Sequence, residues 1–61
     1  MANLTSKELT AIEEQLGSEE RIIKEYQVCA HNATDSSFQT LCREMATKHQ
    51  QHYDTLYGHL S

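Results

Sequence analysis

The stretch HNATDSS, residues 31–37, decides the fold, because it is the one strong break in an otherwise helix-friendly chain. Asn, Thr, Asp and Ser favour turns and helix starts over helix interiors, since their short polar side chains compete for backbone hydrogen bonds. The chain has 61 residues and no proline. The sequence therefore predicts two helices, at about residues 6–32 and 36–58, joined by a tight turn at about residues 33–35.

The first helix begins with a clear capping signal. Thr5 can cap the chain while Glu8, three residues later, reaches back to it, as in a capping box. Beyond this cap one face of the helix repeats at alternating spacings of three and four, which is typical of a helix with one buried side. This stripe contains Leu9, Ile12, Leu16, Glu19, Ile23, Tyr26, Ala30 and Ala33.

The second helix has two candidate caps, Asp35 and Ser36, and Gln39 could complete a capping box with Ser36. Its stripe contains Phe38, Leu41, Cys42, Met45, His49, His52, Leu56 and Leu60. A turn this short makes the two helices antiparallel neighbours. We therefore predict an all-α fold, a single helical-hairpin domain over residues 1–61.

Two helices alone make a poor core, because each has only one partner. The chain is 38% hydrophobic, and a domain this small usually needs a disulfide, a metal or a second chain. The remedy we predict is a homodimer in which two hairpins form a four-helix bundle.

Charge and hydropathy argue against several other classes. The net charge is −4 and the five Lys and Arg are scattered among acids, so nucleic acid is not an expected partner. No apolar run approaches the roughly 20 residues that span a bilayer, so we expect no membrane insertion. The start, MANLTSKEL, lacks the pattern of a secretion signal. We expect synthesis in the cytoplasm without export by a signal peptide.

Three polar residues interrupt the two stripes: Glu19 on the first helix, and His49 and His52 on the second. At 1.5 Å of rise per residue, Glu19 and His49 both lie roughly 20 Å from the turn, with His52 about one turn further. We therefore expect these three side chains at one height of the bundle. Imidazole and carboxylate together suit a divalent metal such as zinc or iron.

Two structural alternatives compete with a metal site. Glu19 could accept hydrogen bonds from His49 or His52 and set the register of the helices, or the layer could face water. The two cysteines, Cys29 and Cys42, lack the spacing of a metal motif. We expect them to be reduced core thiols, with a disulfide between the helices as the less favoured alternative.

The segments EERIIKEY (residues 19–26) and FQTLCREMATKHQQHYDTL (residues 38–56) resemble one half of a ferritin-like, rubrerythrin-type bundle. That family carries a Glu seven residues before a Tyr, as Glu19 and Tyr26 stand here, and then Glu-x-x-His on the next helix. His52 matches the family histidine, whereas His49 stands where the family has its second Glu. The chain is most similar to the small ferritin-like spore coat proteins of the coat F type, in KELTAIEEQL, IIKEY and KHQQHYDTL.

The resemblance covers one helical hairpin of a fold that normally has two. It implies an assembly role without catalysis, possible coat-layer partners, a place in the spore coat, and Tyr26 near a metal. Because His49 replaces a carboxylate, it favours zinc or another late divalent ion over di-iron oxygen chemistry. We therefore expect a structural protein acting through self-association, then a metal-binding bundle, and last a ferritin-type oxidoreductase. No independent catalytic constellation predicts an enzyme.

Overall fold

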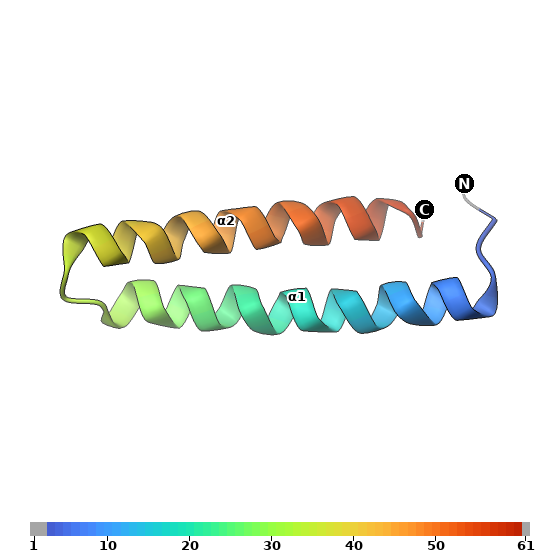
Figure 1. The fold of residues 1–61 in the computed structure, drawn as a ribbon, viewed down its shortest axis with the longest axis horizontal. Helices are drawn as coiled ribbons and strands as arrows, with labels where there is room; N and C mark the ends of the chain where they lie inside the picture. The colour runs from blue at the N-terminus through green and yellow to red at the C-terminus, as the bar shows by residue number, and fades with distance from the viewer. Residues whose placement is uncertain (1–2, 61) are drawn as a thin grey trace.

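A computed structural model describes residues 3–60 as two long helices packed side by side in opposite directions (Figure 1). Helix α1 spans Ser6–Asn32 and helix α2 spans Ser36–Gly58. The molecule is a rod of 46 × 16 × 11 Å, with the turn at one end and both chain ends at the other. The all-α helical hairpin predicted from the sequence is confirmed.

At the start of each helix a side chain caps a backbone amide group. The Thr5 hydroxyl accepts a hydrogen bond from the Glu8 amide at 3.1 Å, and Glu8 Oε1 accepts from the Thr5 amide at 2.9 Å, which confirms the capping box. Asp35 caps α2, because its Oδ1 accepts from the Phe38 amide at 2.8 Å. The alternative cap at Ser36 is wrong, since Ser36 is already the first helical residue. These caps satisfy amide groups that a helix start leaves without partners.

Gln39 forms a hydrogen bond with α1 in place of the capping box with Ser36 that the sequence suggested. Its Nε2 donates to the Ala30 carbonyl oxygen at 2.8 Å, so the side chain ties the first turn of α2 to the last turn of α1. The final carbonyl groups of a helix have no partner inside that helix. This hydrogen bond therefore satisfies one of them and holds the two helix ends together across the turn.

The interior of the hairpin is thin. Within residues 3–60 the buried side chains are Ile23, Ala30 and Cys42, together with one charged residue, Glu19. Many other members of the two apolar stripes stay half-buried, because each helix is covered on one side only. Packing therefore stabilises the isolated hairpin weakly, and single contacts between the helices carry unusual weight.

The cysteines correct one of our expectations. Cys29 of α1 and Cys42 of α2 form a disulfide, with their Cα atoms 6.1 Å apart, instead of two reduced core thiols. The short turn brings both helices within bridging reach, about one turn from the bend on α1 and about two turns on α2, and the Cα–Cα distance lies in the usual range for a disulfide. In the chain-entropy account, closing a loop with a sequence separation of 13 contributes about 3 kcal/mol. The bridge thus offsets part of the deficit in apolar burial.

Neither helix has the length and hydropathy together that a bilayer span requires, over the residues that the structure describes.

Replacing Gly17 with alanine should stabilise the protein by about 1 kcal/mol, since glycine is the poorer helix former and Gly17 lies well inside α1. A Cβ built at Gly17 meets no atom within 4 Å, so the added methyl group causes no clash. Thermal and urea unfolding followed by circular dichroism measure the change. Gly58→Ala is the matched control: a Cβ there is equally unobstructed, but Gly58 ends α2 and should yield a smaller gain. A loss of stability in Gly17→Ala would contradict this account.

Candidate metal centre

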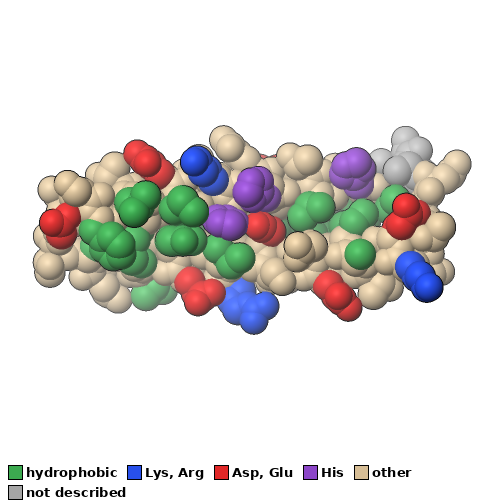
Figure 2. All heavy atoms as spheres, in the orientation of Figure 1, with side chains coloured by type: hydrophobic (Ala, Val, Ile, Leu, Met, Phe, Trp, Pro, Cys, Tyr) green, Lys and Arg blue, Asp and Glu red, His purple; other side chains and the backbone are tan. Residues whose placement is uncertain are grey.

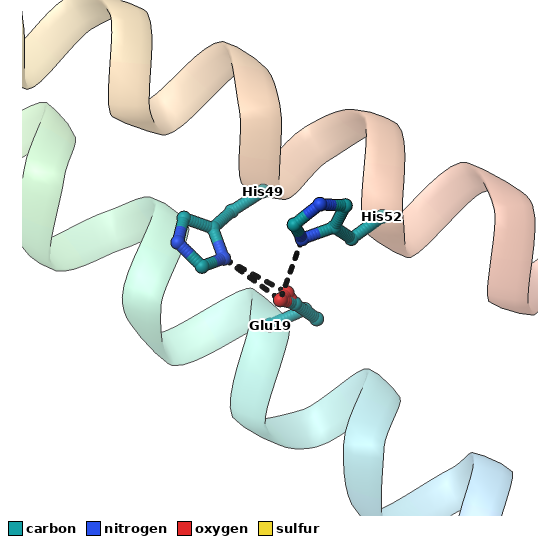
Figure 3. A network of polar contacts seen from close by, with 3 residues as sticks. All are labelled: Glu19, His49 and His52. Carbon is teal, nitrogen blue, oxygen red and sulfur yellow. Dashed lines mark hydrogen bonds and ion pairs between the residues drawn. The ribbon is translucent and has the colours of Figure 1, made fainter.

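Glu19, His49 and His52 meet between the two helices, as their positions along the chain predict (Figure 3). The site forms because Glu19 faces α2 from the buried stripe of α1, whereas His49 and His52 lie one helical turn apart on α2. One ligand atom from each of the three side chains lies within 4.8 Å of the others. Residues 30 positions apart in sequence thus share one small polar site.

The strongest contact is between Glu19 and His49. Nδ1 of His49 lies 2.8 Å from Oε1 and 3.0 Å from Oε2 of Glu19. Because an ionised carboxylate can only accept, the histidine carries its proton on Nδ1 and donates it to both oxygens. A buried carboxylate without such a donor would cost several kcal/mol, roughly, in lost hydration. Glu19 can therefore be buried as an anion because His49 donates this hydrogen bond to it.

His52 occupies a different environment from His49. Its Nδ1 lies 3.6 Å from Glu19 Oε1, which is too long for a hydrogen bond but within ion-pair distance. Its side chain is 62% exposed, compared with 19% for His49. Its ring packs edge-on against the His49 ring, with the centroids 5.2 Å apart. His52 thus stands over the outer opening of the site and leaves the inner contact to His49.

The same contacts decide the charge state of Glu19. The hydrogen bond from His49 holds the pKa of Glu19 below its ordinary value, and the charges of the two imidazoles lower it further. Burial acts in the opposite direction but is outweighed. Glu19 is therefore an anion at neutral pH although its residue is only 8% exposed.

Tyr26 supports the site from α1. Its ring stacks on the ring of His49, with centroids 5.9 Å apart and planes 17° from parallel. This contact fixes the orientation of the imidazole that donates to Glu19. The sequence indicated a place for Tyr26 near the site through a resemblance; the stacking itself had no sequence signal.

The two carboxylate–imidazole distances suit a tetrahedral divalent ion. With bonds of about 2.0–2.1 Å, two ligand atoms of a tetrahedral zinc lie roughly 3.3 Å apart. The distances from Glu19 to His49 and to His52, 2.8 and 3.6 Å, bracket that value. A metal would take the place of the proton on His49 Nδ1, so binding would release that proton. The exposed side of His52 leaves room for a further ligand from solvent or another chain.

The geometry also satisfies the alternative of a polar layer without metal. Within residues 3–60, no buried side-chain nitrogen or oxygen lacks a hydrogen-bond partner. The contact between Glu19 and His49 alone satisfies the buried carboxylate, and His52 adds little to it. The metal hypothesis and the polar-layer hypothesis therefore differ in what they require of His52.

Glu19→Gln should lower the free energy of unfolding by about 1–2 kcal/mol at pH 7, because a neutral amide replaces the charged acceptor of the His49 hydrogen bond. The depressed pKa of Glu19 contributes stability above the ordinary value of 4.5, and this stability is lost as the pH falls through the lower pKa of the folded state. The deficit of the variant should therefore shrink as the pH is lowered toward about 3. Urea unfolding across this range, in chelator-containing buffer, measures it.

Glu20→Gln removes the same charge from the next residue, which is exposed, and serves as the control. It should stay within about 0.5 kcal/mol of the parent at every pH. Equal effects at positions 19 and 20 would show that the inter-helix hydrogen bond contributes nothing specific.

In comparisons with known proteins, no protein-family model, no curated protein and no solved structure matches this chain. The resemblance to ferritin-like spore coat proteins therefore stays a prediction, and the arguments about function below start from the geometry.

Proposed function

We propose that this protein is a structural, assembly protein whose hairpin pairs with a second copy to complete a four-helix bundle. The observation that carries the proposal is an apolar face left open beside the helix–helix contact. On α2, Phe38 and Leu41 are 52% and 49% exposed, and Met45 follows one turn later. On α1, Ile22 and Tyr26 stand one turn apart and are half-buried. These five residues are called the open face below.

A shared hollow and the helical spacing place the open face on one side of the hairpin. Ile22 and Tyr26 line a surface hollow together with His49 of α2. Leu41, Met45 and His52 lie at spacings of four and seven, so they share one stripe of α2. Figure 2 shows hydrophobic side chains gathered over the turn half of one side of the rod, next to histidines and an acidic side chain. Both helices thus present apolar residues in the same direction.

The surface area supports a second copy as the occupant. The chain exposes 4754 Å², whereas a folded monomer of 7.0 kDa exposes about 4,000 Å². The excess of roughly 700 Å² is close to the ~800 Å² that each partner contributes to a stable interface. A second hairpin supplies the two further helices that this fold class normally has, and it matches the open face with an identical one.

The resemblance to spore coat proteins extends the proposal to location and partners. We propose that paired hairpins pack with other coat-layer proteins in a spore-related layer, after synthesis in the cytoplasm. Neither step requires catalysis.

Leu41→Glu should convert the dimer into a monomer, weakening association at least tenfold, because it places an uncompensated charge in the apolar interface. Leu41 is exposed in the single hairpin, so helicity should be preserved. Native mass spectrometry and sedimentation velocity measure the oligomeric state. Val28→Glu is the matched control: Val28 is 59% exposed but lies about 160° around α1 from Tyr26, away from the open face. A parent protein that is monomeric at all concentrations overturns the proposal.

A second candidate function is divalent metal binding, supported by the convergence of Glu19, His49 and His52. Zinc is the first candidate, because two imidazoles and one carboxylate suit a borderline metal, and iron is the second. Three ligands from one chain suffice to hold such an ion without a second copy. The bundle and the metal site are thus separate proposals that can stand or fall independently.

His52→Ala separates metal binding from a polar layer, since His52 makes no hydrogen bond to Glu19 and is mostly exposed. Stability in chelator should change by less than about 0.5 kcal/mol. Zinc affinity, measured by calorimetry, should fall by more than the roughly 10–100-fold that loss of an outer-shell partner costs. In the parent, zinc at 100 times its Kd should add about 2.7 kcal/mol, reversed by chelator.

His31→Ala is the control for a histidine outside the cluster and should leave zinc affinity unchanged. If the parent shows no zinc-dependent stabilisation, or if His52→Ala binds zinc as tightly as the parent, the cluster is a polar layer only.

A further inference from the structure

The two cysteines of the disulfide differ in accessibility. Cys42 is 1% exposed, which makes it the most deeply buried side chain in the part of the chain described. Cys29 is only half-buried, and it lines a surface hollow with Ile22, Glu25, Tyr26 and His49. It also lines a shallow groove along the outer side of α1, which includes Gly17, Arg21 and Val28. Solvent therefore reaches the bridge from the Cys29 side.

We propose that Cys29 is a site of thiol–disulfide exchange with a low-molecular-weight thiol. Exchange proceeds by attack of a thiolate on one sulfur, and access decides which sulfur is attacked. The incoming thiolate forms a bond to Cys29 Sγ, the Cys29–Cys42 bond breaks, and its electron pair leaves on Cys42 Sγ, which takes up a proton. The products are a mixed disulfide at Cys29 and a free Cys42 thiol, so no external oxidant or reductant is needed.

The chain around the bridge favours this direction of exchange. The sulfur of Cys42 is shielded by its burial, so an attacking group has no comparable approach to it. Once released, Cys42 sits as a small apolar thiol, a state that buried cysteines commonly occupy. The adduct on Cys29 projects into the hollow and does not need to enter the contact between the helices.

Exchange at Cys29 also regulates assembly, a consequence that rests on the proposed pairing of hairpins. Ile22, Tyr26 and Cys29 follow one another at spacings of four and three, so Cys29 continues the stripe by which α1 contributes to the open face. A polar peptide-sized thiol attached there covers the open face. Thiol modification and docking of a second copy therefore exclude each other.

The first test compares two single-cysteine variants with oxidised glutathione as the probe. In Cys42→Ser, the Cys29 thiolate attacks the probe, forms a mixed disulfide and releases one glutathione thiolate. This variant should be modified at least ten times faster than Cys29→Ser, whose Cys42 thiol is buried. Intact mass spectrometry follows the rate, and circular dichroism checks that both variants are helical. Equal rates, or faster modification of Cys29→Ser, overturn the proposal.

Peptide mapping of the unmutated protein is an independent test that does not depend on how the variants fold. The oxidised protein is treated briefly with reduced glutathione, and free thiols are then alkylated. Glutathione should be found on Cys29 and the alkyl group on Cys42, in at least tenfold excess over the reverse pattern. The reverse pattern, an even mixture, or a bridge that resists glutathione until the chain unfolds overturns the site.

Native mass spectrometry of Cys42→Ser with and without the adduct then tests the link to assembly. The unmodified variant should be a dimer and the glutathionylated variant a monomer. A dimer that persists with the adduct overturns the regulatory consequence. If both forms are monomeric while Cys29 is still modified selectively, the proposed pairing fails and the exchange site stands.

Discussion

A single buried carboxylate sets the conditions for this hairpin. Glu19 stands on the inner side of α1, where a negative charge is tolerated only because His49 of α2 donates to both of its oxygens. The two residues are 30 positions apart, so the contact exists in one alignment of the helices only. Sliding α2 by one helical turn in the direction that brings Met45 toward Glu19 would leave the carboxylate facing an apolar side chain. In a fold with so few buried residues, this requirement specifies register more sharply than the apolar packing does.

Local sequence signals were sufficient to predict the hairpin. The capping box at Thr5 and the polar turn act within a few residues, and the alternating stripes follow from helical geometry alone. The meeting of Glu19, His49 and His52 also follows from counting residues on either side of the bend, because rise per residue is constant. The sequence could not predict that His49 donates the hydrogen bond to Glu19 while His52 stays mostly exposed. This difference depends on how far each side chain reaches across the helix–helix contact.

Other features depend on the third dimension and were predicted wrongly or not at all. Cys29 and Cys42 were expected to be separate thiols, since sequence alone shows no distance between their sulfurs; the bend brings them together. The role of Gln39 changed because the Ala30 carbonyl, nine residues earlier, turned out to be its nearest acceptor. The stacking of Tyr26 on His49 likewise needs the lateral offset of the helices, which periodicity does not give. Propensity and period describe single helices, whereas these contacts belong to a pair.

The contacts that join the two helices are unevenly distributed along the rod, and this decides where the hairpin opens most easily. Near the bend the helices are joined by the turn, by the disulfide and by the side chain of Gln39. The glutamate–histidine contact lies farther along the rod. Beyond it the two helices continue to the end of the rod opposite the bend. Local opening should therefore be graded, with amide protons exchanging slowest beside the bend and fastest toward the free tips. The two helices are thus held together at the bend and are free to separate at their far ends. A ligand at the glutamate–histidine site would join α1 to α2 partway along the rod and so shorten the segment over which the helices can separate.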